Sequence, residues 1–293
     1  MKKFLILNIL LLCFILFLPN CNAPKTKSDS NISSNFETID KSPSKNLKTL
    51  FYYFKIQNNG TLIDMAQKAQ AQWPWYPKDY NFMSNKVSEI TPIINNLGLI
   101  KEINFASQKS YKYALVFCGY VGVICSRLEY LAKFIDKGIK FEKIIILSGQ
   151  RKLVSYDWES LDQYKLTSED KKLSGTKTQH ELIKIVYDLL EFNKKFKNIP
   201  VIFTNTPKSA KHIPYPEDDI RYWLATNPEP GDCFVVTNQP YVYALNTQLQ
   251  NLLPKDFKII DTVGYSINPK YYSVPLWLGA VSWLLYERYI RGK

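Results

Sequence analysis

The chain has 293 residues, of which 46% are hydrophobic and 14% aromatic, a composition that excludes general disorder and supports one large core or two small ones. Lysine and arginine number 38 against 26 aspartate and glutamate, which gives a formal net charge of +12. These basic residues are spread along the chain without a compact block of interleaved aromatics, so no nucleic-acid surface is expected. Such an excess is typical of a solvated basic surface, or of a protein that meets an anionic membrane or a phosphorylated ligand.

The chain begins with an expected export signal. Two lysines precede an apolar stretch at residues 4–18, which is the layout of a secretory signal sequence. Signal-peptidase cleavage after Ala23 is disfavoured because Pro24 follows. Residues 18–21, Leu-Pro-Asn-Cys, resemble instead a bacterial lipobox in which Cys21 would be acylated. The lipid anchor is the preferred interpretation, and an uncleaved membrane anchor is the main alternative.

The composition divides the chain into four segments. Residues 1–21 are assigned to the signal peptide and lipobox, and residues 22–46, rich in Ser, Asn, Lys and Pro, to a flexible tether that cannot bury a core. Residues 47–109 are expected to form a mostly helical extension, and residues 110–293 the main domain. This organisation predicts an exported, membrane-associated lipoprotein of a bacterial cell envelope.

Short apolar runs alternate with amphipathic segments in the main domain. Each run is continuously apolar, as strands buried on both faces should be. The runs are residues 113–119, 143–149, 200–205, 233–238 and 257–264. Capping-box patterns predict helix starts at Ser126 and Thr178, and further helices are expected to open at Asp218 and near Pro240 in a first turn. The alternation predicts an α/β, Rossmann-like, doubly wound and mostly parallel five-stranded sheet flanked by helices.

Two segments depart from this alternation. Residues 152–177 are long, charged and poor in apolar periodicity, so they are expected to form a lid over a site or an insertion. Residues 274–293 are apolar for about a dozen positions, too few to span a bilayer. Core packing is the expected role of that C-terminal segment, and an interfacial helix is the alternative.

The cysteines of the main domain, Cys118, Cys125 and Cys233, show neither a CxxC motif nor zinc-ligand spacing, and no metal site is expected. One disulfide could form in an oxidising compartment. Buried free thiols are favoured because Cys118 and Cys233 lie in apolar strand runs.

A ligand site is expected beyond the carboxyl ends of the strands, where the strand order of an open α/β sheet reverses. Most of the predicted strands end in glycine or in small hydroxyl and amide residues, although turns in general prefer such residues. Arg127 and Arg151 each follow a strand and are candidates for holding a phosphate or carboxylate. The candidate ligand-binding residues are Gly119, Arg127, Ser148, Gly149, Arg151, Thr237 and Asn238. The two histidines, His180 and His212, would serve as a general base only if one of them folds beside Ser148 or Thr237.

Several of these motifs occur in an order known from one family. Cys118-Gly119, Arg127-Leu128, Ser148-Gly149 and Val236-Thr237 follow one another as the Leu-Gly, Arg-Leu, Ser-Gly-Gly and Val-Thr motifs do in the SanA/YdcF-like, ElyC-related family of bacterial envelope proteins. The resemblance covers roughly residues 110–265. It implies a Rossmann-like sheet and makes Glu181, at the place of the family's helix glutamate, the candidate catalytic acid or base.

The chain also departs from the family pattern. Gln150 replaces the second glycine of Ser-Gly-Gly, and the family's Thr-x-Glu-Asn segment has no clean counterpart. The histidine that usually follows Val-Thr is replaced within residues 238–245. If that histidine is catalytic in the family, the activity has been lost or rerouted in this chain.

The expected function follows from the resemblance and from the polar strand ends. The chain is expected to be a membrane-tethered domain that binds a phosphorylated or nucleotide-like ligand, and to catalyse hydrolysis or transfer on it in envelope maintenance. Its expected partners are an anionic small molecule or lipid-linked phosphate, and the membrane surface through the N-terminal anchor, but no nucleic acid. The alternative is a non-enzymatic envelope interaction protein with a degenerate pocket. The sequence names neither a cofactor nor a substrate.

Overall fold

The computed structural model describes residues 43–56, 60–73, 84–117, 119–208, 216–269 and 273–292. The predictions for the signal sequence, for lipidation of Cys21 and for most of the tether fall outside these residues. So do Cys118 and His212.

One parallel sheet organises the main domain, as the sequence predicts. Its strands are β1 (Ser110–Val116), β2 (Lys140–Ile146), β3 (Val201–Phe203), β4 (Asp232–Asn238) and β5 (Lys258–Tyr265), in the spatial order β3-β2-β1-β4-β5. Val116 of β1 pairs with Ile146 of β2 on one side and with Val236 of β4 on the other. All three are fully buried, which explains why these runs are apolar without alternation.

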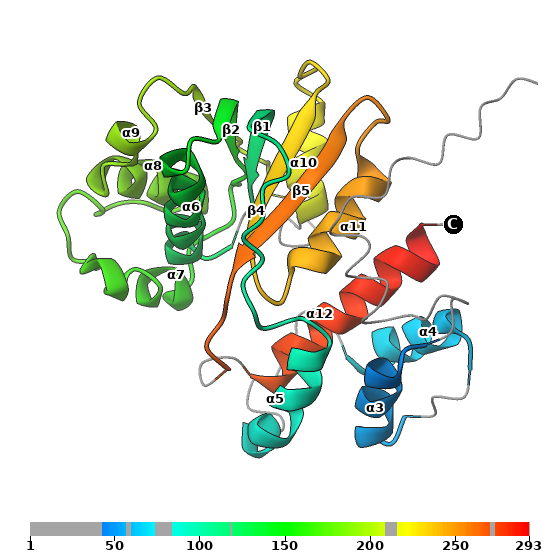
Figure 1. The fold of residues 1–293 in the computed structure, drawn as a ribbon. Coiled ribbons are helices and arrows are strands. Elements are labelled where there is room, and N and C mark those ends of the chain that lie inside the picture. Colours follow the sequence, from blue (N-terminus) through cyan, green and yellow to red (C-terminus); the bar gives the residue numbers. More distant parts are fainter. Residues whose placement is uncertain are drawn as a thin grey trace, which may run out of the picture.

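Helices cover both faces of the sheet (Figure 1). The helices α6 (Val121–Asp136) and α8 (Gln179–Leu189) connect β1, β2 and β3 and share a core with one face, whereas α10 (Pro216–Leu224) and α11 (Val242–Leu252) connect β3, β4 and β5 and pack on the other. The chain therefore adds β2 and β3 on one side of β1, and then crosses over to add β4 and β5 on the other side of β1. The strand order reverses between β1 and β4, as in a doubly wound fold.

The expected helix starts differ in their outcome. Thr178 caps α8 in a capping box with Glu181, as predicted, and Asp218 lies in the first turn of α10, which begins two residues earlier. The prediction of a start at Ser126 is wrong because α6 already begins at Val121, where apolar side chains pack against the sheet. Pro240 is likewise outside the first turn of α11, which begins at Val242.

Shorter elements join the larger ones. The segment at residues 152–177 contains α7 (Ser155–Glu159) and the 3-10 helix η2 (Asp162–Tyr164), and α9 (Phe192–Lys195) follows α8. Cys125 and Cys233 are buried free thiols, as favoured from the sequence, and burial raises the pKa of Cys233 to about 12.

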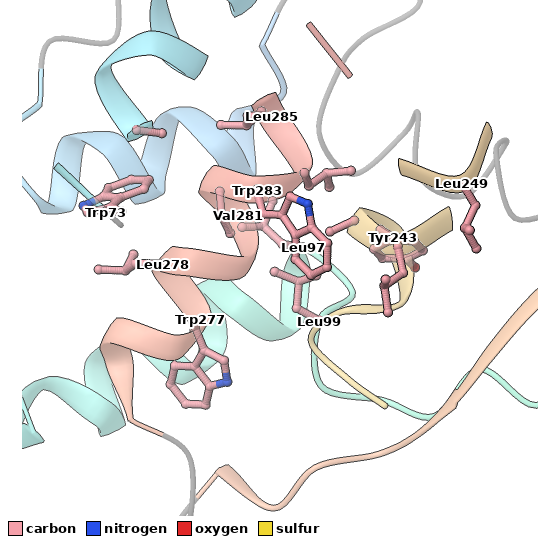
Figure 2. Packing of buried hydrophobic residues seen from close by; sticks show 14 of the residues in the cluster. Trp73, Leu97, Leu99, Tyr243, Leu249, Trp277, Leu278, Val281, Trp283 and Leu285 are labelled. Atoms are coloured by element: carbon pink, nitrogen blue, oxygen red, sulfur yellow. The ribbon is translucent and has the colours of Figure 1, made fainter. Parts of the chain in front are cut away.

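The N-terminal extension is helical and shares a core with the C-terminal helix. It comprises α3 (Lys45–Tyr53), α4 (Leu62–Gln72), the 3-10 turn η1 (Ser84–Lys86) and α5 (Val87–Asn96), while the chain closes with α12 (Val274–Tyr286) and the π-helical turn η4 (Glu287–Arg291). Figure 2 shows Trp277 and Leu278 of α12 in the same cluster as Trp73, which follows α4, and Tyr243 of α11. Trp277 is fully buried, so the expected core-packing role of the C-terminal segment is confirmed.

The last part of the extension crosses the carboxyl ends of two strands. Ile103 pairs antiparallel with Gly264 at the end of β5. Beside it, the buried side chain of Gln239, just after β4, donates from Nε2 to the carbonyl oxygens of Gly98 (3.0 Å) and Lys101 (2.8 Å). The extension therefore closes one side of the edge at which a ligand was expected.

Candidate functional site

Arg127 links the two strands between which the order reverses. Its guanidinium, on α6, donates from Nε to Oδ1 of Asn238 (3.0 Å) at the end of β4, and from Nη1 to the carbonyl oxygen of Phe117 (2.9 Å) just after β1. The residue is only 4% exposed. Gly119 lies next to this guanidinium, since a Cβ added at Gly119 would be 3.3 Å from Nη1 of Arg127. The structure thus brings three of the predicted site residues, Gly119, Arg127 and Asn238, to one point.

Arg151 reaches the same loop from the other side, but it is held by an acid. It forms a bidentate ion pair with Asp157 of α7, with Nη1–Oδ2 and Nη2–Oδ1 distances of 2.8 and 2.7 Å. Its Nη2 also lies 3.4 Å from the carbonyl oxygen of Gly119, and the guanidinium sits 5.8 Å above the ring of Tyr120. The charge of Arg151 is therefore balanced within the protein.

The first turn of α6 is capped by residues of the segment 152–177 that contains α7, the α7 segment. The amide of Val121 donates to Oδ1 of Asp157 (3.3 Å), and the amide of Gly122 donates to Oγ of Ser160 (2.9 Å). A Cβ at position 122 would lie 1.8 Å from the carbonyl oxygen of Ser160, so only glycine permits this approach. Figure 1 shows α7 beside the N-terminal end of α6 at the carboxyl edge of the sheet. Two of the backbone donors that a helix start offers to an anion, the amides of Val121 and Gly122, are therefore occupied here by the chain itself.

His180 lies beside Ser148 at the ends of β2 and β3. Nδ1 of His180 is 2.8 Å from the carbonyl oxygen of Thr204 and 3.2 Å from Oγ of Ser148. Because a carbonyl oxygen only accepts, the hydrogen bond assigns the imidazole proton to Nδ1 and the lone pair to Nε2. Burial lowers the pKa of His180. The neutral ring is therefore favoured near pH 7, with Nε2 as the basic atom.

The Ser148 hydroxyl does not face that basic atom. The side chain is fully buried, and its Oγ donates to the carbonyl oxygen of Thr204 (2.6 Å), while its amide donates to Oγ1 of Thr204 (2.7 Å). These contacts fix the end of β2 against β3. Ser148 is consequently held in a position that orders the strand ends, and His180 is not arranged to activate it as a nucleophile.

Gln179 joins the two glycines of the predicted site, and nothing in the sequence singled it out. Its Oε1 accepts from the amide of Gly149 (3.3 Å), and its Nε2 donates to the carbonyl oxygen of Gly119. Gln179 is the first residue of α8, next to the Thr178 cap. Its place directly after a capping residue is the one signal that could have drawn attention to it.

Thr237 and Glu181 lie apart from this cluster. Thr237 is fully buried, and its Oγ1 has no hydrogen-bond partner among the described residues. Successive side chains of a strand point to opposite faces, so Thr237 faces away from the side on which Asn238 meets Arg127.

The Glu181 carboxylate is exposed and accepts from the amides of Lys177 (2.7 Å) and Thr178 (3.1 Å). These hydrogen bonds, first that of Lys177, lower the pKa of Glu181. Helix capping alone accounts for a glutamate at this position, and its catalytic role stays a prediction.

Neither a depression on the surface nor a group of metal ligands among the described residues adds to the strand-end site. A shallow depression of about 370 Å³ lies on α4, lined by Gly60, Asp64, Gln67, Lys68 and Ala71, and contains none of the strand-end residues. In the part of the chain that the structure describes, no group of His, Cys, Asp and Glu side chains could hold a metal ion. None of the helices described is both long and apolar enough to cross a bilayer.

Comparison with known proteins returned no relative: no protein-family model, no curated protein and no solved structure matches this chain significantly.

Proposed function

We propose that the carboxyl edge of this sheet binds a small phosphorylated or nucleotide-like ligand, and that the chain serves in envelope maintenance as an exported, membrane-tethered domain of the SanA/YdcF-like type. The observation that carries the proposal is the approach of two guanidinium groups, those of Arg127 and Arg151, to the loop that follows β1, where the strand order reverses. Guanidinium groups suit phosphate because they offer paired donors and a permanent charge.

Asp157 indicates how such a ligand would be held. Its carboxylate accepts from both terminal nitrogens of Arg151, Nη1 and Nη2, and from the first amide of α6, that of Val121. A phosphate group would use the same donors. Ligand binding then requires that Asp157 be displaced and that the α7 segment move, which makes residues 152–177 the lid among the two roles expected from the sequence.

Hydrolysis or transfer on the ligand would need a general acid or base. The resemblance favours Glu181, whereas the geometry offers Nε2 of His180, one residue earlier on α8. Two variants distinguish Glu181 from His180 as the general acid or base. Glu181→Gln removes the charge but preserves the capping box. His180→Gln removes the imidazole and leaves that box intact.

The alternative, a non-enzymatic interaction protein with a degenerate pocket, is favoured by one observation. Asp157 neutralises Arg151 and helps to cap α6, so the donors are already satisfied without a ligand. In this interpretation the α7 segment is a permanent insertion rather than a lid.

Thermal unfolding of the full chain with adenosine triphosphate, a hexose phosphate or a short polyprenyl phosphate distinguishes the two. A ligand present at one hundred times its Kd stabilises a protein by about 2.7 kcal/mol, which corresponds to a rise in Tm of roughly 5–10 °C for a chain of this size. Arg127→Lys keeps the positive charge but loses the paired donors of the guanidinium group, so it should reduce the ligand-induced rise in Tm. The control is Arg221→Lys, on the exposed face of α10. If none of the three probes raises Tm, the binding proposal fails and the alternative stands.

A further inference from the structure

The α7 segment exposes an aromatic ring beside the candidate site. Tyr156 is the second residue of α7 and is 51% exposed, whereas its neighbour Asp157 is fully buried. Leu161, just after the helix, is also fully buried and lies in the same core as α6. Packing of the segment on the domain therefore accounts for Asp157 and Leu161, but it does not require a large ring at position 156.

The ring of Tyr156 packs against a second tyrosine that borders the site. Its centroid lies 5.5 Å from that of Tyr120, with 33° between the two ring planes. Tyr120 is the N-cap residue of α6 and follows Gly119 directly, and the guanidinium of Arg151 lies 5.8 Å from the centre of the Tyr120 ring. Tyr156, Tyr120 and Arg151 thus form a continuous surface that is aromatic at one end and cationic at the other.

The chemistry of this surface selects among phosphorylated compounds. A guanidinium group pairs with a phosphate, and the face of a tyrosine ring stacks on a flat heteroaromatic base. A nucleotide carries both a flat base and a phosphate. A hexose phosphate and a polyprenyl phosphate carry the phosphate alone, so neither of them would use the two tyrosines for stacking.

Tyr156 and Asp157 are neighbours on one short helix, so the movement proposed for the α7 segment involves both side chains. Displacement of Asp157 makes the guanidinium of Arg151 accessible to a phosphate, and the same displacement shifts the ring of Tyr156 relative to that of Tyr120. A base that stacks on Tyr156 replaces the contact between the two tyrosines with one of the same kind. Opening of the segment is thereby offset at both ends of the surface.

We infer that the ligand of this site is a nucleotide, whose base stacks on the ring of Tyr156 and whose phosphate pairs with Arg151. Tyr156 then determines specificity, because it contributes to the binding of compounds that carry a base and nothing to the binding of those that lack one. The inference rests on the phosphate-binding part of the proposed function, and it adds the chemical class of the ligand.

Isothermal titration calorimetry on the full chain compares adenosine monophosphate with ribose 5-phosphate, which has the same sugar and phosphate but no base. Adenosine monophosphate should bind roughly five to one hundred times more tightly. Tyr156→Ala should raise its Kd to that of ribose 5-phosphate and leave the latter unchanged, whereas Tyr156→Phe keeps the ring and should retain the preference. The matched control is Tyr222→Ala, at an exposed tyrosine of α10, which should alter neither Kd.

The fluorescence of 2-aminopurine riboside monophosphate reports the stacking itself, because the emission of this base is quenched when it stacks on an aromatic ring. At saturation the wild type and Tyr156→Phe should quench the emission, and Tyr156→Ala should leave most of it.

Failure of this inference and failure of the proposed function give different results. Equal affinity of the wild type for adenosine monophosphate and ribose 5-phosphate would overturn the inference and leave the phosphate-binding proposal in place. The same holds if Tyr156→Ala weakens both compounds equally, which would indicate a structural role of the ring, or if the preference for adenosine monophosphate persists in that variant, which would place the base elsewhere. If neither compound binds the wild type, the phosphate-binding proposal and the inference fall together.

Discussion

The ion pair between Arg151 and Asp157 should stabilise the fold asymmetrically with respect to its two partners. Asp157 is fully buried, whereas the Arg151 side chain is 15% exposed and also contacts the ring of Tyr120. Arg151→Gln leaves a carboxylate in the interior without a cation, for which we expect a loss of about 3–5 kcal/mol in the free energy of unfolding. Asp157→Asn removes the charge but keeps an oxygen that accepts from Arg151, so the expected loss is smaller, about 1.5–3 kcal/mol.

Urea unfolding followed by tryptophan fluorescence measures both losses, and the double variant closes a mutant cycle. The coupling energy should be large, because the two side chains meet through two hydrogen bonds of 2.7 and 2.8 Å. If Asp157→Asn costs more than Arg151→Gln, or if both cost less than about 0.5 kcal/mol, the effect typical of surface substitutions, the argument from burial is refuted. The same Asp157→Asn variant should bind a phosphate-bearing ligand more tightly than the wild type, since the internal competitor for Arg151 is weakened.

Three further predictions concern the starts of helices α6 and α8. Thr178→Ala should lower stability by about 1 kcal/mol in chemical denaturation because it removes the N-cap of α8, whereas Glu181→Gln should leave stability close to the wild type. Because burial lowers the pKa of His180, the unfolded state takes up the proton first, so stability should be full above a pH of roughly 6.5 and fall as the pH drops below it; His180→Gln should flatten that part of the profile. Gly122→Ala should cost about 1–3 kcal/mol or more and speed proteolysis of the α7 segment, because the added Cβ meets the carbonyl oxygen of Ser160.

Each of these has an outcome that would contradict it. A Glu181→Gln variant as unstable as Thr178→Ala would mean that the carboxylate does more than cap the helix. Identical pH profiles for the wild type and His180→Gln would show that the ring is not desolvated. Gly119→Ala is the control for Gly122→Ala, because its nearest neighbour is the end of the Arg127 side chain at 3.3 Å, and it should leave proteolysis of the α7 segment unchanged.

The α/β class could be predicted from the sequence because its signals are local. The continuous apolar runs at residues 143–149 and 233–238 each become a buried parallel strand, although β2 ends three residues before the run does. The Thr178 capping box is also local, since its partners lie three residues apart. Local patterns of this kind are set by the spacing of side chains along the backbone and need no knowledge of the fold.

The same kind of pattern failed at Ser126, and the reason is tertiary. Val121 and Ile124 are fully buried against the sheet, so α6 extends through them and leaves Ser126 inside the helix, where its hydroxyl donates to the carbonyl oxygen of Gly122 (3.0 Å). Two equivalent capping patterns therefore had opposite outcomes. Packing decided between them, because burial of apolar side chains outweighs the contribution of one cap.

For the site, the sequence by itself determined which residues stand at the strand ends, and the tertiary structure decided what each of them contacts. Arg127 and Asn238 are 111 positions apart, and only the parallel pairing of β1 with β4 brings their side chains within hydrogen-bonding distance. Arg151 was identified from its place after β2, but its neutralisation by Asp157 depends on how the α7 segment folds back. Charge and position are properties of the sequence, whereas the partner of a charge is a property of the fold, because it is fixed by distances that only packing sets.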